Sequence, residues 1–213
     1  MNDIVKNFQN IKSSINNSNV NIIAVSKTFS FDKIKPLVDF GHNHFGENKV
    51  QEAKNKWSNI REKNSKLQLH MIGKLQTNKA KDAVALFDYI HSVDNEKLAT
   101  DIAKYECLSG KKNKYFIQVN LGNETQKSGV HIDKLSDFYL FCKKISLNII
   151  GLMCIPPNEK NSKKYFIQLS NLNKFLKLDE VSMGMSADYL DAVQCGSTFI
   201  RIGSAIFGDR AIK

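Results

Sequence analysis

Short apolar runs alternate with amphipathic stretches along nearly the whole chain. The runs are four to eight residues long, which is the usual length of a strand, and several, such as "IIAV", are apolar without interruption. A strand that is apolar on both faces is typical of a parallel sheet covered by helices. The expected strands are 21–27, 43–46, 67–72, 88–91, 114–121, 148–154, 177–182 and 198–202.

The stretches between these runs carry apolar residues at helical spacing. Helices are expected at 32–40, 48–62, 77–86, 95–109, 133–145, 161–175 and 186–194, with a short one near 204–207. A further helix is expected at the N-terminus, where Ile4, Phe8, Ile11 and Ile15 recur on one face. Acidic residues such as Asp32 stand where first turns are expected, which favours helix formation.

The order of these elements predicts the topology. Strands that alternate with helices pair in parallel, and eight such units favour closure into a (β/α)8 TIM barrel, here with an extra N-terminal helix. An open doubly wound sheet is the alternative, but it usually has a Gly-x-Gly-x-x-Gly turn after its first strand. Residues 26–30 read Ser-Lys-Thr-Phe-Ser, without glycine. Because no linker or break in composition occurs, residues 1–213 are expected to form a single domain.

Composition favours a soluble globular protein. The 213 residues are 42% hydrophobic and 24% charged, and the longest apolar stretches, such as 149–157, are too short to span a bilayer. The N-terminal helix contains Asp3 and lacks the apolar core of a signal peptide. The four cysteines form no Cys-x-x-Cys pair, so we expect reduced, mostly buried thiols in a cytoplasmic protein. They are Cys107, Cys142, Cys154 and Cys195.

The net charge of +10 raises the possibility of nucleic-acid binding. Of the 31 basic residues only Arg61, Arg201 and Arg210 are arginines, and the lysines are spread through every segment. Proteins that read bases usually concentrate arginine, whose planar guanidinium suits phosphate and guanine. A drift towards lysine and asparagine, as an AT-rich genome produces, explains the charge more simply. Nucleic-acid binding therefore stays an alternative that rests on charge alone.

The first expected strand ends on Lys27, although lysine is rarely buried without a partner. Lys27 either lies where the strand meets solvent, or it is a reactive amine at the C-terminal end of a strand. Barrel enzymes place their active groups at that end, so the second interpretation depends on what else lies there.

Two glycine-containing segments follow the last two expected strands, where barrels often bind phosphate. Residues 182–186 read Ser-Met-Gly-Met-Ser, and residues 201–208 read Arg-Ile-Gly-Ser-Ala-Ile-Phe-Gly. Both offer hydroxyls and free amides at a helix start, a combination that holds phosphate. An amine and a phosphate site on one rim suggest an aldehyde that carries a phosphate. Pyridoxal 5'-phosphate fits this description, with Lys27 as its Schiff-base partner.

Arg201 gains a possible role from its place on the last strand, beside the first strand of a closed barrel. An arginine that faces the pyridine nitrogen opposes protonation of that nitrogen, because two cations repel each other at contact distance. A neutral ring is a poorer electron sink, which restricts carbanion chemistry. The alternative for Arg201 is a surface salt bridge.

The remaining candidates favour structural roles. His42 and His44 have the spacing of a pair, but no third metal ligand is evident, so no metal site is expected. His70 and His91 are expected to be hydrogen-bonded barrel residues. Cys154 has no dedicated base and is expected to be a packed thiol.

Six sequence blocks resemble those of a known family. They read "AVSKT", "FGEN" followed by "VQE", "H-x-IG-x-LQ-x-NK", "GLM-x-IPP", "SMGMS-x-D" and "GST-x-IRIG-x-AIFG", at 24–28, 45–48 with 50–52, 70–79, 151–157, 182–188 and 196–208. Together they resemble the pyridoxal phosphate homeostasis proteins, which are single-domain barrels similar to the N-terminal domain of alanine racemase. The blocks run in order along nearly the whole chain, which chance does not explain.

The resemblance implies roles for particular residues. Lys27 takes the position of the lysine that forms the Schiff base, and Arg201 that of the residue at the pyridine nitrogen. Asn48 is implied to lie near the cofactor ring. The implied phosphate contacts are Ser186, Gly203 and Ser204, with Ser182, Met183 and Gly184 in the same loop.

The resemblance also implies a function: intracellular homeostasis of pyridoxal 5'-phosphate (vitamin B6) as a carrier or buffer, without established catalysis. It implies a monomer, and enzymes that lack their cofactor are possible transient recipients. The alternative is an amino-acid racemase or decarboxylase. Two-base racemisation needs an acid–base group opposite the lysine, which racemase relatives take from a second, β-rich domain that a chain of this length does not accommodate.

Overall fold

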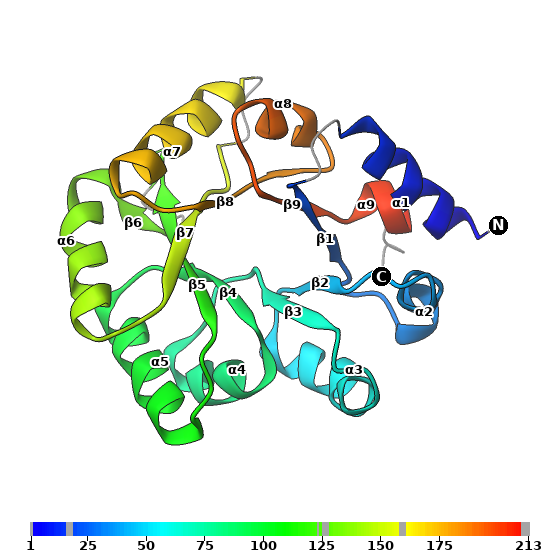
Figure 1. Ribbon diagram of the computed structural model, residues 1–213, viewed down its shortest axis with the longest axis horizontal. Coiled ribbons are helices and arrows are strands. Elements are labelled where there is room, and N and C mark those ends of the chain that lie inside the picture. Colours follow the sequence, from blue (N-terminus) through cyan, green and yellow to red (C-terminus); the bar gives the residue numbers. More distant parts are fainter. Residues whose placement is uncertain (1, 16–18, 123, 125–127, 158–160, 210–213) are drawn as a thin grey trace.

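The computed structural model describes residues 2–15, 19–122, 124, 128–157 and 161–209, and in them eight parallel strands close into a barrel (Figure 1). The strand order is β1-β2-β3-β4-β5-β7-β8-β9, and β9 pairs with β1 to complete the circle. The predicted (β/α)8 TIM barrel is therefore confirmed. The barrel strands are β1 (Asn21–Val25), β2 (His44–Glu47), β3 (Gln68–Met71), β4 (Tyr89–Val93), β5 (Lys114–Asn120), β7 (Ile149–Met153), β8 (Glu180–Met185) and β9 (Phe199–Ile202).

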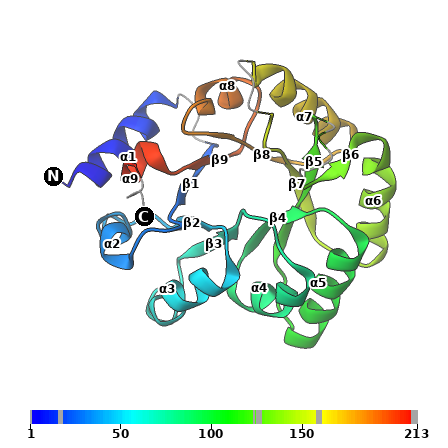
Figure 2. The same cartoon turned by 180° about the vertical axis from the view of Figure 1, so that it is seen from behind.

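Helices surround the barrel, as Figures 1 and 2 show from its two sides. They lie close to the predicted positions: α2 (Phe31–Asp39), α3 (Val50–Lys63), η1 (Thr77–Lys79) with α4 (Ala80–Leu86), α5 (Glu96–Ser109), α6 (Ile132–Lys144), α7 (Lys163–Phe175), α8 (Tyr189–Gln194) and α9 (Ser204–Phe207). None of the described helices is both long and apolar enough to cross a membrane.

The extra N-terminal helix, α1 (Asp3–Ser14), is also confirmed. Its first turn is capped by the side chain of Asn2, which accepts a hydrogen bond from the Ile4 amide at 2.9 Å. α1 lies beside α9 (Figure 1), and the Asn7 amide donates to the Ile206 carbonyl. The extra helix thus covers the part of the barrel that the four-residue α9 is too short to cover.

The structure differs from the sequence-based expectation in the bounds of most strands; β4, for example, ends at Val93, where 91 was expected. A short strand β6 (Val130–His131) was not predicted, and it pairs with the end of β5 outside the barrel circle. β1 ends at Val25, two residues before Lys27. β8 runs to Met185, although 182 was the expected end, because Gly184 has a φ of +89° within a register shift and continues the strand through a bulge.

Two apolar cores follow from the alternation of side chains along each strand. The larger core lies between strands and helices and includes Trp57 and Phe166, both fully buried. The smaller core fills the barrel itself and consists of Ile23, Tyr89, Phe116, Met153 and Phe199. The barrel is therefore a packed interior, and a ligand has to bind at its mouth.

Gly151 is a point where the packing of β7 on β8 requires glycine. A Cβ at this residue would lie 1.9 Å from the carbonyl oxygen of Glu180. We expect Gly151→Ala to lower the free energy of unfolding by about 3 kcal/mol, because two paired strands have to separate. Gly110→Ala is the control. Gly110 has a φ of +66° but nothing within 4 Å of an added Cβ, so only about 1 kcal/mol is expected. Urea unfolding followed by circular dichroism measures both, and equal losses would contradict this interpretation.

Candidate functional site

Segments that follow β1, β2, β8 and β9 meet at the C-terminal mouth of the barrel. β1 pairs in parallel with both β2 and β9, and β9 pairs with β8. The register places Ala24 opposite Ile202 and Arg201 opposite Met185. The structure therefore brings the residues after β1, where Lys27 lies, next to those after β9, where Gly203 lies.

Lys27 lies in a turn and not in a strand. Its side chain is half-buried, the preceding Ser26 is fully buried, and the following Thr28 is exposed. Thr28 has a φ of +70°, an uncommon conformation for a residue with a branched side chain. Such a conformation persists only where neighbouring contacts hold it.

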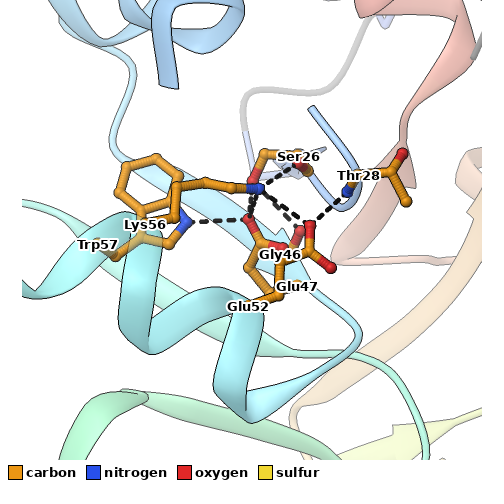
Figure 3. A network of polar contacts seen from close by, with 7 residues as sticks. All are labelled: Ser26, Thr28, Gly46, Glu47, Glu52, Lys56 and Trp57. Carbon is orange, nitrogen blue, oxygen red and sulfur yellow. Dashed lines mark hydrogen bonds and ion pairs between the residues drawn. The ribbon is translucent and has the colours of Figure 1, made fainter. Parts of the chain in front are cut away.

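A buried carboxylate supplies some of those contacts (Figure 3). The Oε1 atom of Glu47, at the end of β2, accepts hydrogen bonds from Ser26 Oγ at 2.7 Å and from Trp57 Nε1 at 2.9 Å. It also accepts one from Lys56 Nζ at 2.9 Å, in an ion pair whose side chains are 0% and 9% exposed. One carboxylate oxygen thus joins the residue before Lys27 to helix α3.

Lys56 and Glu52, one turn apart on α3, complete this network. Lys56 Nζ donates to the Ser26 carbonyl at 2.8 Å and to Glu52 Oε1 at 3.2 Å. Glu52 Oε1 also accepts a hydrogen bond from the backbone amide of Thr28 (Figure 3). The backbone is therefore tied to α3 on both sides of Lys27.

Sequence reasoning did not find the Glu47–Lys56 pair. Charged residues on an amphipathic helix read as solvent-facing, and Lys56 is one of many lysines. The available signal was Glu47 itself, a carboxylate at the end of an apolar strand, which needs a buried partner.

The segments after β8 and β9 contact each other through Ser186. Its Oγ accepts hydrogen bonds from the backbone amides of Gly203 at 3.3 Å and Ala205 at 3.4 Å. Gly203 precedes α9, and a Cβ at this residue would lie 3.5 Å from the Cβ of Val25. Ser204, the first residue of α9, is exposed. A serine hydroxyl and the amides at the start of α9 thus lie beside the end of β1.

The residues Ser182, Met183 and Gly184 do not lie in that loop, which corrects the expectation from sequence. They belong to β8, and strand alternation points them in different directions. Ser182 faces the barrel interior, where its hydroxyl contacts Arg201, whereas Met183 is fully buried in the outer core. The glycine that looked like a loop signal belongs to a bulge.

Arg201 is 4% exposed and lies inside the barrel. One guanidinium nitrogen, Nη1, donates to Ser182 Oγ, and the other, Nη2, donates to the Cys154 carbonyl just after β7, both at 2.8 Å. Burial lowers the pKa of the guanidinium, although an arginine stays protonated in proteins. The surface salt bridge considered from sequence is wrong, because this side chain is buried.

Asn48 follows β2, the strand that pairs with β1, and is half-buried. It lines a cavity of about 350 Å³ together with Gln118 and Ser128 from the β5 side. A Cβ on Gly73 would lie 2.4 Å from the Asn48 carbonyl oxygen, so the segments after β2 and β3 are closely packed here. Asn48 is thus held at the rim of a hollow in the C-terminal mouth.

The expectations that His70 and His91 are hydrogen-bonded barrel residues and that Cys154 is a packed thiol are confirmed. His70 and His91 are fully buried and hydrogen-bonded inside the barrel, and burial lowers the pKa of both. Cys154 is a packed thiol whose pKa burial raises to about 12. The cysteines are less uniformly buried than expected, since Cys107 is exposed.

Fold and site together define a barrel of the alanine racemase N-terminal class. The family model described as "Alanine racemase, N-terminal domain" matches residues 1–211. The pyridoxal phosphate homeostasis protein of Vibrio cholerae is 36% identical over 204 residues, which cover 91% of this chain and 86% of that protein. The one from Escherichia coli is 31% identical over 229 residues, 99% of this chain and 98% of that protein. The chain belongs to the pyridoxal phosphate homeostasis protein family.

Solved structures agree with this assignment. One of them is the structure of PipY from Synechococcus elongatus with pyridoxal phosphate (PLP) bound. It is 34% identical in sequence, has a TM-score of 0.89, and the match covers 96% of this chain and 100% of PipY. The same protein without PLP has a TM-score of 0.87. An alanine racemase of Clostridium difficile shares the fold at 15% identity, with a TM-score of 0.76 over 57% of its length.

The buried ion pair between Glu47 and Lys56 can be tested by removing its cation. We expect Lys56→Met to lower the free energy of unfolding by about 3 kcal/mol, because the Glu47 carboxylate stays buried without a cation. Lys54→Met on the same helix is the control. The Lys54–Asp82 pair is about half exposed, so less than about 0.5 kcal/mol is expected. Urea unfolding measures both.

A double variant distinguishes loss of the pair from loss of packing. Glu47→Gln combined with Lys56→Met leaves no fully buried charge in the network, because the remaining Glu52 carboxylate is partly exposed, and should therefore recover part of the stability lost in Lys56→Met. Similar small losses for the two single lysine variants would refute the buried-pair interpretation.

Proposed function

We propose that this protein binds pyridoxal 5'-phosphate covalently through Lys27 and acts as a carrier or buffer of it in the cytoplasm. The observation that carries the proposal is the turn of Lys27, which is tied to α3 on both sides of the lysine at the mouth where the Ser186 and Gly203 segments meet. The names of the relatives and the PLP-bound PipY structure support the same function.

The residues at the mouth fit the chemistry of this cofactor. When bound, pyridoxal phosphate supplies an aldehyde that forms a reversible carbon–nitrogen bond with a primary amine. Lys27 offers that amine, and the amides of Gly203 and Ala205 with the hydroxyls of Ser186 and Ser204 offer donors for the phosphate. The long hydrogen bonds from these amides to Ser186, 3.3 and 3.4 Å, cost little to exchange for phosphate oxygens.

The other residues of the mouth receive roles in the same proposal. Arg201 supplies a cation towards the pyridine nitrogen, and Asn48 contacts the ring from the β2 side. Ser182, Met183 and Gly184 contribute indirectly, because β8 holds Ser186 in place and Ser182 holds Arg201. This assignment gives Ser182 a role beside Arg201, whereas the resemblance placed it in the loop of the phosphate contacts.

A carrier is favoured over an enzyme by the properties of Arg201. A permanent cation facing the pyridine nitrogen keeps that nitrogen unprotonated and weakens the electron sink on which racemisation and decarboxylation depend. We infer that the protein acts as a single-domain monomer and releases its cofactor to enzymes that lack it. Reversible binding protects cellular amines from the free aldehyde.

The nucleic-acid alternative gains no support from the arginines that the structure describes. Arg201 is buried in the barrel, and Arg61 is held by the Leu86 carbonyl and by an ion pair with Asp88. Neither presents a free planar guanidinium to a phosphate backbone.

Covalent binding is tested by loading the protein with pyridoxal phosphate, reducing the linkage with borohydride and locating the modified peptide by mass spectrometry. We expect the label on Lys27 and loss of the visible absorbance band in Lys27→Ala, because the linkage needs this amine. Lys33→Ala, an exposed lysine of α2, is the control and should keep the band. The proposal would be overturned if the label were distributed over surface lysines and were equal in Lys27→Ala and Lys33→Ala.

Turnover distinguishes a carrier from an enzyme. The loaded protein is incubated with a panel of L- and D-amino acids, and the products are separated by chiral chromatography. We expect no racemisation or decarboxylation above that of free cofactor, because the ring lacks a protonated nitrogen. Robust turnover that disappears in Lys27→Ala would establish an enzyme instead.

A further inference from the structure

A continuous chain of hydrogen bonds crosses the barrel interior below the candidate site. His44 Nδ1 lies 3.0 Å from His70 Nε2, and His70 Nδ1 lies 3.0 Å from His91 Nε2. His91 Nδ1 lies 2.9 Å from Ser182 Oγ, which accepts a hydrogen bond from Arg201. His44 is the first residue of β2, so the chain begins at the N-terminal mouth of the barrel and ends at the guanidinium.

The guanidinium determines the direction of every hydrogen bond in this chain. Arginine only donates, so Ser182 Oγ accepts from Arg201 and donates its own proton to His91 Nδ1. A neutral imidazole has one N–H, which leaves His91 donating from Nε2 to His70 Nδ1, and His70 donating from Nε2 to His44 Nδ1. If His91 Nδ1 donated to Ser182 Oγ instead, the Ser182 hydroxyl proton would have no acceptor among the described residues.

Burial keeps these imidazoles neutral. Burial is the largest cause that lowers the pKa of His44, His70 and His91, and neighbouring cations add to it: Lys114 for His44, and Arg201 for His91. The Asp88 carboxylate acts in the opposite direction on the pKa of His44, which nevertheless stays lowered. The mutual repulsion of the histidines lowers the pKa of His70 further. A second proton on any of them is thus disfavoured at neutral pH.

Aromatic stacking holds the two central imidazole rings in fixed planes. The His70 ring stacks on Tyr89 with centroids 4.3 Å apart and planes 11° apart, and the His91 ring stacks on Phe116 at 4.2 Å and 15°. Phe199 lies within 6.0 Å of both imidazole rings. Packing thus fixes the plane of each ring, and the hydrogen bonds to the neighbouring groups select the orientation within that plane.

We propose that His91, His70 and His44, acting through Ser182, are positioning residues for Arg201, and that all three are neutral Nε2–H tautomers. The described residues place no carboxylate within ion-pair distance of this buried guanidinium. Its charge is instead stabilised by a row of aligned dipoles, since hydrogen bonds in a chain polarise one another. The proposal rests on the proposed function only in taking Arg201 to face the cofactor.

The tautomers are tested first in the cofactor-free protein, so the outcome does not depend on whether pyridoxal phosphate binds. Nitrogen-15 NMR of labelled histidine distinguishes the two neutral tautomers and the imidazolium. At pH 7 we expect three Nε2–H imidazoles, assigned by His44→Gln, His70→Gln and His91→Gln, each of which removes one signal. An Nδ1–H tautomer or an imidazolium at any of the three positions overturns the proposed direction.

Positioning is tested by interrupting the chain. His91→Phe keeps a ring to stack on Phe116 but removes both nitrogens, and Ser182→Ala removes only the hydroxyl in case the larger change impairs folding. The control is His131→Phe, because His131 is exposed and does not belong to the hydrogen-bond chain. We expect proton exchange at the Arg201 guanidinium to be at least about tenfold faster in both chain variants, and unchanged in the control.

The loaded protein gives an independent readout of the same role. In His91→Phe and Ser182→Ala the visible absorbance maximum of the bound cofactor should shift, because the cation near its ring has moved, while the control keeps the wild-type maximum. Wild-type exchange at Arg201 together with an unshifted maximum in a folded Ser182→Ala would overturn the positioning role. Failure of the wild type to take up cofactor would sink the proposed function and leave the exchange result to decide this inference.

Discussion

The pairing of β1 with β9 is the contact on which the site depends. Four residue pairs, from Asn21 with Phe199 to Ala24 with Ile202, join the first strand to the last and close the barrel. The same pairing places the turn of Lys27 beside the segment of Gly203, since neighbouring parallel strands end on the same side. Without closure, the amine and the proposed phosphate donors would lie at two separate edges of an open sheet.

Sequence patterns were sufficient to predict an element where its apolar residues form an uninterrupted buried run or face. Runs such as Ile22–Val25 predicted barrel strands because both of their faces are covered, and the amphipathic stretches predicted the helices between them. Sequence patterns failed where one residue type is compatible with two backbone structures. Gly184 reads as a turn in sequence but continues a strand through a bulge, so Ser182 was assigned to a loop although it belongs to the barrel interior.

The polar network could not be predicted from sequence for a different reason. Glu47 and Lys56 are nine residues apart on a strand and a helix, and His91 and Ser182 are ninety-one residues apart. Local patterns carry no information on such partners, and charged residues read as exposed unless the partner is known. The residues in question all surround the candidate site, where polar groups are retained inside a fold at some cost in stability.

The contact of α1 and β1 with α9 and β9 has a consequence for biosynthesis. Ribosomes release a chain from its N-terminus, so β1 and the turn of Lys27 emerge long before β9 and α9 exist to pair with them. Contacts between such distant parts of a chain form late in folding, because a long loop has to close first. The nascent protein therefore exposes Lys27 as an ordinary surface amine during most of translation, and the proposed cofactor site is complete only when synthesis of the barrel is finished.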